Sequence, residues 1–466
     1  MNPVSFQMHR HSRLNYDEAL AFWYGCINYE QRSPQPDDLK LEQMRALLAQ
    51  LGNPHEQLRI IHVAGSKGKG STSAMLAAIL REAGFLTGLF TSPHLCGVEE
   101  RIQVDGRPIA SDELTSQLEE VQTAVRELQA CRTSGRNQIA FSPTFFEVAT
   151  ALGFLYFHRR RVDWALVEVG LGGRLDSTNV CIPEVALITS ISFDHTRQLG
   201  NSLASIAREK AGIVKSGRPV ISGTKNPEAR AVIEQVCQER RAPLRQLGID
   251  FHYEYTPGKI EADTCTSATG AVQIRTEERI WPAMELGLLG EHQATNAAVA
   301  VACTEALRNA GWQIADSAVA RGLAGVSWPA RLEVVSHRPL VVLDCAHNVA
   351  SASALTAALK TSFPPGRKIL IFASSNDKDV AGMFKILGPV FSHIFLTRYG
   401  KNPRSVLPEE LARTLGQVAG TPSTICPTAI EAWHRARELA TPADVICIAG
   451  SVFLAGELRP VLVGPQ

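Results

Sequence analysis

Apolar runs rich in Val and Ile alternate with helical patterns along most of the 466-residue chain, and this alternation limits the folds that the chain can adopt. The first cycle runs from LRIIHVA, which begins at Leu58, into STSAMLAAILREAG, which begins at Ser71. Further strands are expected in WALVEVG and VALITSIS, and the helical pattern SLASIAREKAGIV follows the second of them. Strand, loop and helix repeating in this order are typical of a parallel sheet with helices on its faces. The N-terminal part is therefore predicted to be an α/β domain.

The same rhythm restarts after SWPARLE, residues 327–333. PLVVLDCAHN leads into SASALTAALKTSF, RKILIFASS into a helix, and HIFLTRYG into PEELARTLGQVAG, and a last pair, IEAWHRARELA and VICIAGSV, closes the chain. We expect a second, smaller α/β domain, with one domain over residues 1–328 and the other over residues 329–466. Before this boundary, the polar stretch from Thr256 is expected to form hairpins or loops, and GEHQATNAAVAVACTEALRNAG a long helix that stops at Gly311.

Composition excludes several classes of partner. Hydrophobic residues make up 45% of the chain and charged residues 20%, which is typical of a globular protein. Lys and Arg total 47 against 46 for Asp and Glu, so no net charge favours nucleic acid or an anionic membrane surface. The ten cysteines are scattered without a CxxC pair, which indicates a reducing compartment. The N-terminus lacks the apolar core of a signal peptide and no apolar run has membrane-spanning length, so we expect a cytoplasmic protein.

The turn GSKGKG, residues 65–70, joins the first strand to the first helix. Its backbone N–H groups can converge on an anion, Ser71 is expected to begin a helix whose positive end faces the same point, and Lys69 adds a cation. The strict Walker pattern would place Gly where Val63 stands and Ser or Thr where Gly70 stands. We favour a nucleotide phosphate site over the alternative, a glycine turn that binds nothing.

Three later segments end apolar strands in polar residues. They are LFTSPHL with Ser92 and His94, ALVEVGLGGRLDSTN with Glu168 and Asp176, and ITSISFDHT with Asp194 and His195. Because ligands of open parallel sheets bind beyond the carboxyl ends of the strands, we expect these loops to converge on the phosphate turn. Glu168 stands between apolar residues and needs a cation, which Mg²⁺ on a nucleotide would supply, with Ser92 as a second oxygen ligand. The alternatives are a salt bridge from Glu168 to a lysine and a hydrogen-bonded core histidine at His195, since imidazole favours softer metals.

Nine motifs occur in an order that resembles the folylpolyglutamate synthase and dihydrofolate synthase family, which belongs to the Mur ligase superfamily of ATP-dependent amide-bond ligases. They are GSKGKGST, FTSPHL, ERIQVDGRPI, EVGLGGRLDSTN, SFDHT, SIAREKAGI, GEHQATNAAVA, WPARLE and LDCAHN, dense from about Leu58 to Asn348 and looser beyond. The resemblance implies the Mur ligase architecture, with a P-loop-type, mainly parallel sheet domain followed by a smaller Rossmann-like glutamate ligase domain. It also implies the reaction. ATP phosphorylates a carboxylate of dihydropteroate or of a folate's glutamate tail, the amine of L-glutamate attacks the acyl phosphate, and phosphate leaves.

The resemblance also implies roles for individual residues. The ATP phosphates would lie on Gly65, Ser66, Lys67, Gly68, Lys69, Gly70, Ser71 and Thr72, with further nucleotide contacts from Asn296, Arg331 and Asp344. The Mg²⁺ ligands would be Ser92, Glu168, His195 and Lys210, the last as a carbamylated lysine that carries a second ion. Catalysis would involve Lys69, Lys210, Asp344 and His347, and the substrates would contact Thr91, Ser92, Pro93, His94, Leu95 and His347. In isolation, Lys210 would be read as a solvated helix lysine, Asp344 as a capping residue and His347 as a surface histidine.

The chain departs from the family pattern at a few positions. Ser66 and Lys67 stand where the family often has Thr and Asn, and Cys345 stands where glycine is common. The segment FASSNDKDVAGM keeps an Asp-Lys-Asp but matches more loosely. Lys67 adds a charge beside the triphosphate, whereas Cys345 is a small change that affects packing.

We therefore expect a bifunctional ligase that makes dihydrofolate and extends folate polyglutamates, uses ATP and Mg²⁺, and acts as a monomer on small molecules, without nucleic acid or membrane partners. One alternative is another Mur-type ligase that acts on cell-wall nucleotide precursors. A second is a P-loop regulatory protein or kinase that forms no amide. A third is a nucleotide-binding scaffold without catalysis.

Overall fold

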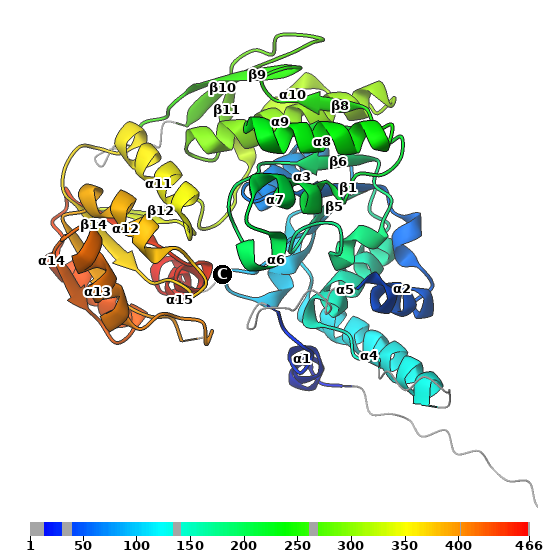
Figure 1. The fold of residues 1–466 in the computed structure, drawn as a ribbon, viewed down its shortest axis with the longest axis horizontal. Coiled ribbons are helices and arrows are strands. Elements are labelled where there is room, and N and C mark those ends of the chain that lie inside the picture. Colours follow the sequence, from blue (N-terminus) through cyan, green and yellow to red (C-terminus); the bar gives the residue numbers. More distant parts are fainter. Residues whose placement is uncertain (1–13, 30–39, 134–140, 261–268, 401, 465–466) are drawn as a thin grey trace, which may run out of the picture.

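A computed structural model describes residues 14–29, 40–133, 141–260, 269–400 and 402–464 (Figure 1). Two large sheets organise it, one in the N-terminal part and one in the C-terminal part. None of the helices within these ranges is both long enough and apolar enough to cross a lipid bilayer.

The first sheet has eight strands, and the six in its centre and along one side run parallel. In spatial order they are β4 (Arg107–Pro108), β3 (Ile102–Val104), β2 (Thr87–Phe90), β5 (Trp164–Glu168), β1 (Ile60–Ala64), β6 (Val185–Ile188), β7 (Val220–Ser222) and β8 (Leu244–Gln246). β3 and β4 are antiparallel additions at one edge. The central strands are buried along their whole length, so they read as continuous apolar runs rather than as alternating patterns.

Helices cover both faces of this sheet. The helices with their bounds are α1 (Tyr16–Tyr24), α2 (Leu41–Gln50), α3 (Lys69–Glu82), α4 (Ser111–Thr133), α5 (Phe145–Arg160), α6 (Thr196–Leu199), α7 (Leu203–Ala211), α8 (Pro227–Glu239), α9 (Glu291–Asn309) and α10 (Asp316–Gly325). One apolar cluster joins α3, α9 and α10 to the sheet, a second joins α2, α4 and α5, and a third joins α7 and α8. The sheet is thus buried on both sides, as the alternating pattern predicts.

Helix α3 begins at Lys69, two residues earlier than the sequence led us to expect. Gly68 precedes it with a φ of +83°, in the left-handed region that glycine adopts without strain. The chain therefore turns into the helix directly after Gly68, and Lys69 and Gly70 already belong to its first turn.

The polar stretch after Thr256 forms a hairpin in its described part. β9 (Phe251–Thr256), β10 (Gly270–Thr276) and β11 (Met284–Leu286) make a three-stranded antiparallel sheet beside α9. Residues 261–268 lie outside the described residues. The long helix α9 ends at Asn309, and Gly311 follows with a φ of +96°, which agrees with the expected stop.

The second sheet has six strands, five of them parallel. In spatial order they are β12 (Glu333–His337), β13 (Leu340–Leu343), β17 (Val445–Ala449), β14 (Lys368–Phe372), β15 (His393–Leu396) and β16 (Ser423–Ile425), with β12 antiparallel at the edge. Its helices are α11 (Val349–Ser362), α12 (Val380–Leu387), α13 (Pro408–Val418), α14 (Ala429–Leu439) and α15 (Val452–Val463). The expected boundary at residue 328 falls between α10 and β12, and as a division into independent domains it stays a prediction.

The chain does not close on the strand VICIAGSV, because helix α15 follows β17. Its sequence VFLAGELRPVLV is apolar around most of the helix and contains Pro460, so it lacks the period of an amphipathic helix. Ser451 caps it by accepting a hydrogen bond from the N–H of Phe453 at 3.1 Å. The helix packs between the second sheet and the N-terminal part of the molecule (Figure 1).

Candidate active site

The glycine turn between β1 and α3 is held in place by the loop that follows β6. The N–H of Ser66 donates to Ser190 O at 2.8 Å, and the N–H of Lys67 donates to Ser190 Oγ at 3.0 Å. Thr189 Oγ1 donates in turn to Lys67 O at 2.6 Å. A Cβ atom at Gly65 would lie 1.9 Å from Thr189 Oγ1, so a side chain has no space there. The loop that follows β6 therefore holds the glycine turn through several hydrogen bonds and a close packing contact.

The start of α3 offers groups that suit a phosphate. The first N–H groups of a helix lack intrahelical acceptors and lie at the positive end of its dipole. Thr72 Oγ1 and Ser73 Oγ are buried, and neither has a hydrogen-bond partner among the described residues. These donors and the Lys69 ammonium fit the negative oxygens of a nucleotide triphosphate.

Glu168 ends β5 beside the turn, where it is 4% exposed. Its Oε1 lies 3.6 Å from Lys69 Nζ, and its Oε2 accepts a hydrogen bond from the N–H of Ser92 at 3.2 Å. Burial raises the pKa of this carboxyl, and the nearby Lys69 opposes that shift. The ion pair that we held as the alternative for Glu168 is thus present, and it brings an acidic and a basic side chain to the same point at the phosphate turn.

Lys210 is buried on α7 and not solvated, contrary to what its helix position alone suggests. Its Nζ donates a hydrogen bond to Gly65 O at 2.9 Å, so the Lys210 side chain helps to hold the phosphate turn in place. Burial and the nearby Lys69 lower the pKa of Lys210 to about 7. A lysine of this kind is in large part a neutral amine near neutral pH, which is the form that reacts with CO₂ to give a carbamate.

The Mg²⁺ roles expected for Ser92, Glu168, His195 and Lys210 stay predictions. Across the part of the chain that the structure describes, no three His, Cys, Asp or Glu side chains converge as metal ligands. His195 adopts a left-handed conformation before α6, and its Nε2 lies 3.8 Å from Asp194 Oδ1. Glu168 with Ser92 is the oxygen-bearing pair at the turn, and these hard donors suit Mg²⁺. The metal roles of His195 and Lys210 stay predictions.

A cluster of charged side chains joins the phosphate turn to the C-terminal sheet. Lys67 Nζ donates to Asp194 Oδ2 at 2.8 Å and lies 2.7 Å from His347 Nε2. Lys378 Nζ donates to the other Asp194 oxygen at 3.2 Å. The ring Nδ1 of His347 lies 2.7 Å from Cys345 O and must donate to it, so Nε2 is the atom that accepts from Lys67. Lys67 therefore connects the two parts of the molecule.

Asp344 holds the segments that flank the first two strands of the C-terminal sheet. Asp344 Oδ2 accepts from the N–H of Leu332 at 3.0 Å, and Oδ1 accepts from the N–H of Ala346 at 2.7 Å. The carboxylate thus connects the segments WPARLE and LDCAHN. Burial raises the pKa of Asp344, and the nearby charge of Arg331 offsets part of that rise. Asn348 caps α11 with its side chain, which places His347 immediately before a helix N-terminus.

Asn296 on α9 lies against the phosphate turn. A Cβ atom at Gly68 would meet Asn296 Oδ1 at 2.2 Å, and the Asn296 amide donates to Gln293 Oε1 at 2.9 Å. Asn296 thus lies at the turn, and its contact with a nucleotide stays a prediction.

The loop that follows β2 is fixed by two charged side chains. Glu100 accepts hydrogen bonds from the N–H groups of Leu95 at 2.7 Å, Cys96 at 2.9 Å and Gly97 at 3.0 Å. Arg101 Nε donates to His94 Nδ1 at 2.9 Å. Thr91, Ser92 and Pro93 enter this loop directly from β2, so the predicted substrate residues share one rigid segment.

Several site residues were missed by the sequence reasoning. Arg101 is fully buried, and nothing in ERIQVDGRPI distinguishes it from a surface arginine. Lys378 lies in the Asp-Lys-Asp after β14, a signal that could have been used. Asp176, expected to face the phosphate turn, instead accepts hydrogen bonds from the N–H groups of Leu171 and Thr178 and holds its own loop.

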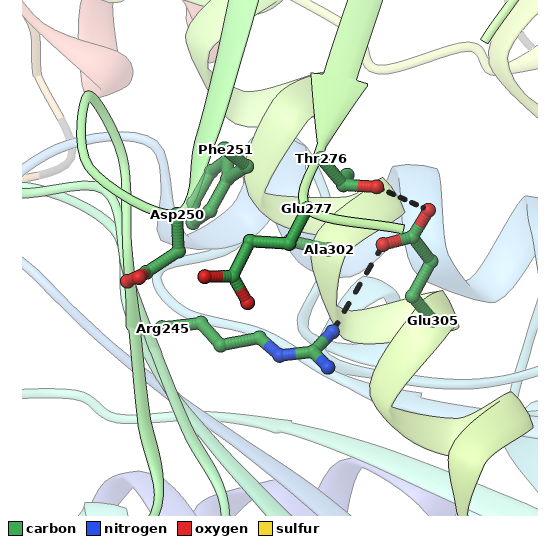
Figure 2. A pocket seen from close by; sticks show the side chains of 7 residues that line it. All are labelled: Arg245, Asp250, Phe251, Thr276, Glu277, Ala302 and Glu305. Atoms are coloured by element: carbon green, nitrogen blue, oxygen red, sulfur yellow. Dashed lines mark hydrogen bonds and ion pairs between the residues drawn. The ribbon is translucent and has the colours of Figure 1, made fainter. Parts of the chain in front are cut away.

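A second polar cluster lies at the other end of α9 and is separate from the phosphate turn (Figure 2). Glu305 accepts hydrogen bonds from Trp281 Nε1 at 2.8 Å and Thr276 Oγ1 at 3.0 Å, and its Oε2 lies 3.9 Å from Arg245 Nη1. The space between these side chains does not admit a water molecule. This cluster therefore joins the hairpin to the first sheet and is not a candidate ligand site.

Comparison with known proteins identifies the family. Residues 63–304 match the Mur ligase middle domain, and residues 330–452 match the glutamate ligase domain of Mur ligases. The dihydrofolate synthase/folylpolyglutamate synthase of Bacillus subtilis is 35% identical over 401 residues, which cover 85% of this chain and 88% of that protein. The chain belongs to the folylpolyglutamate synthase and dihydrofolate synthase family of Mur ligases. The resemblance seen in the nine motifs is confirmed.

Solved members of this family share the fold over nearly the whole chain. The Mycobacterium tuberculosis folylpolyglutamate synthase complexed with ADP superposes with a TM-score of 0.86 at 32% identity, covering 97% of this chain and 100% of that one. Escherichia coli FolC in complex with DHPP and ADP gives 0.81 at 30% identity, covering 95% and 97%. The predicted fold class is confirmed, and the ADP in both complexes agrees with the predicted use of ATP.

Proposed function

We propose that this chain is an ATP-dependent ligase that adds L-glutamate to dihydropteroate and to the γ-carboxylate of reduced folates. Family membership supports the reaction class. The observation that carries the proposal is the meeting of Lys69 and Glu168 at the phosphate turn, 3.6 Å apart, with His347 reached from the same turn through Lys67. A phosphate site and a second set of charged groups thus face each other from the two sheets.

The first step is transfer of a phosphoryl group from ATP to the acceptor carboxylate. A carboxylate is a poor electrophile, and its conversion to an acyl phosphate supplies a leaving group. Phosphoryl transfer requires mainly positioning and neutralisation of charge. The N–H groups at the start of α3 and the Lys69 ammonium hold the phosphates, and Lys210 supports the turn through Gly65 O. Mg²⁺, held by the oxygens of Glu168 and Ser92, would neutralise further negative charge on the phosphates.

The second step is attack by the amine of L-glutamate. Lys67 and Lys378 meet at Asp194 on the boundary between the sheets, and their ammonium groups suit the carboxylates of a dicarboxylate amino acid. Burial keeps the pKa of His347 well below its ordinary value, so the imidazole is neutral at pH 7, and its Nε2 positions Lys67 by accepting a hydrogen bond from it. Asp344 contributes by positioning, since its oxygens hold the backbone on both sides of β13. The tetrahedral intermediate then expels phosphate.

The location of the site between two sheets helps to keep water away from the acyl phosphate. An acyl phosphate hydrolyses if water reaches it, and groups supplied from both sides can exclude water while the amine attacks. We further propose that the protein acts as a monomer, and in the cytoplasm, because its scattered cysteines indicate a reducing compartment.

The experiment is product analysis by mass spectrometry. The purified protein is incubated with ATP, Mg²⁺ and L-glutamate, with dihydropteroate in one tube and tetrahydrofolate in another. A mass increase of one glutamyl residue in both tubes supports the bifunctional enzyme, and an increase in one tube selects that activity. ADP formation that does not depend on glutamate, without any increase in mass, refutes the ligase and favours a phosphohydrolase or kinase.

A further inference from the structure

Helix α15 comes closest to the loop after β2 at Gly456. A Cβ atom at Gly456 would lie 1.9 Å from Leu95 O and 2.9 Å from Leu95 C, whereas real Cβ atoms do not come closer than 3.0 Å. Both neighbours are backbone atoms, which cannot rotate away as a long side chain can. Gly456 lies within a regular helix and does not have a positive φ, so backbone conformation does not require glycine there. Glycine is required at this position because the backbone of Leu95 lies so close.

Other contacts show that the helix and the loop are docked. The side chain of Leu95 packs against the apolar cluster of the C-terminal sheet that includes Leu454 and Leu458. Cys96 Sγ lies 3.8 Å from Gly456 O as a hydrogen-bond donor. A partly buried residue of the N-terminal part therefore packs against the core of the C-terminal part.

Both sides of this contact are anchored. On the helix side, Arg459 Nη2 donates to Glu333 Oε1 of β12 at 2.8 Å, which fixes α15 on its sheet. On the loop side, Glu100 holds the N–H groups of residues 95–97, and the N–H of Ser92 donates to Glu168 Oε2. A shift at Gly456 is thus transmitted through a short rigid segment to the carboxylate at the phosphate turn.

We propose that Gly456 is a positioning residue that lets α15 contact the backbone of Leu95 and so sets the place of residues 92–97, the acceptor loop, relative to Glu168. The proposal rests on the proposed function, because it takes this loop as the one that contacts the pterin acceptor. Restoring a normal Cβ contact in Gly456→Ala requires the helix and the loop to separate by about 1 Å, and a misplacement of this size costs up to about 100-fold in rate.

The test compares Gly456→Ala with Gly416→Ala. Gly416 lies in helix α13, and no described atom comes within 4 Å of its Cβ position, so it is a matched control for a glycine-to-alanine change in a helix. Steady-state kinetics are measured with dihydropteroate and with ATP as the varied substrate. We expect kcat/KM for dihydropteroate to fall by about 10- to 100-fold in Gly456→Ala, with KM for ATP changed by less than about twofold. Gly416→Ala is expected to match the wild type.

Hydrogen–deuterium exchange of the peptide that covers residues 92–101 gives a readout without turnover. In Gly456→Ala the N–H groups of residues 95–97 are expected to exchange faster than in the wild type and in Gly416→Ala. If the wild type forms no amide, the proposed function fails, and the exchange result still decides this proposal. If Gly456→Ala does not fold, Leu454→Ala takes its place, because Leu454 of α15 belongs to the cluster against which Leu95 packs, and the same loss specific to the acceptor is expected. Unchanged exchange with unchanged kcat/KM, or an equal loss for ATP and acceptor, overturns the proposal.

Discussion

Acidification is expected to destabilise strand β1 through His62. This histidine is fully buried in the middle of β1, with Nε2 2.8 Å from Thr178 Oγ1 and Nδ1 3.7 Å from Cys181 Sγ. Burial, aided by the charge of Lys215, lowers the pKa of His62 to about 3. The Thr178 hydroxyl donates its hydrogen to Asp176, so its oxygen accepts a hydrogen bond from the Nε2–H of His62. This arrangement suits a neutral imidazole ring.

The magnitude follows from the difference between the two pKa values. In the unfolded chain His62 takes up a proton near pH 6.5, whereas in the folded chain it resists protonation down to about pH 3. Stability is therefore lost as the pH falls from 6.5 towards 3, with a limiting slope of about 1.4 kcal/mol per pH unit. Between pH 7.5 and pH 5.0 this single group removes about 2 kcal/mol from the free energy of unfolding.

The assay isolates His62 by comparison with His62→Val. Valine suits a buried strand, and Thr178 keeps its hydrogen bond to Asp176 in this variant. Hydrogen–deuterium exchange of the β1 peptide over a urea series gives its unfolding free energy at both pH values, without assuming that the whole chain unfolds together. Other buried histidines, such as His292 with a pKa lowered to about 4, contribute equally to both proteins. The loss between the two pH values should be about 2 kcal/mol larger in the wild type, and an equal loss in both proteins would refute the reasoning.

Three further substitutions test the phosphate turn and its neighbours. Glu168→Gln should lower the rate of amide formation by about 100- to 1,000-fold and raise the Mg²⁺ concentration required, measured as ADP release over a Mg²⁺ series; a change below about threefold would contradict this. Gly65→Ala should destabilise the protein by about 1–3 kcal/mol and abolish ADP binding in calorimetry, because its Cβ meets Thr189 Oγ1 at 1.9 Å, and normal ADP affinity would count against that contact. Lys67→Met removes the donor to His347 Nε2 and should lower kcat/KM for glutamate by about 10-fold, while an unchanged value would show that the contact is dispensable.

The features that the sequence predicted correctly are local ones. A Val- and Ile-rich run followed by glycines and a helical pattern specifies strand, turn and helix over a few residues, and β1, the phosphate turn and α3 follow from it. The helix start was placed at Ser71, two residues late, because the left-handed conformation of Gly68 is not readable from a turn with three glycines. Helix α15 lacks an amphipathic period because apolar residues cover most of its surface, so the sequence did not predict it.

The features that escaped prediction depend on contacts between distant segments. His62 reads as one polar residue in an apolar strand, and its neutral, buried state arises from Thr178, 116 residues away. Lys67 differs from the family pattern, but its meeting with His347 depends on how the two sheets pack. The helical pattern around Lys210 is typical of a solvated lysine, and only its hydrogen bond to Gly65 O shows that it packs against the phosphate turn. The spacing of residues along the sequence does not reveal such contacts between distant segments.

The central claim is that an acceptor carboxylate is activated by phosphorylation before L-glutamate attacks it. The most direct measurement uses dihydropteroate whose carboxylate carries ¹⁸O, together with ATP, Mg²⁺ and L-glutamate, and analyses the inorganic phosphate by mass spectrometry. An acyl phosphate transfers one carboxylate oxygen to the phosphate that leaves, so the account predicts one ¹⁸O in the phosphate for each amide formed. Unlabelled phosphate alongside labelled amide, or phosphate released without glutamate and without amide, would contradict it.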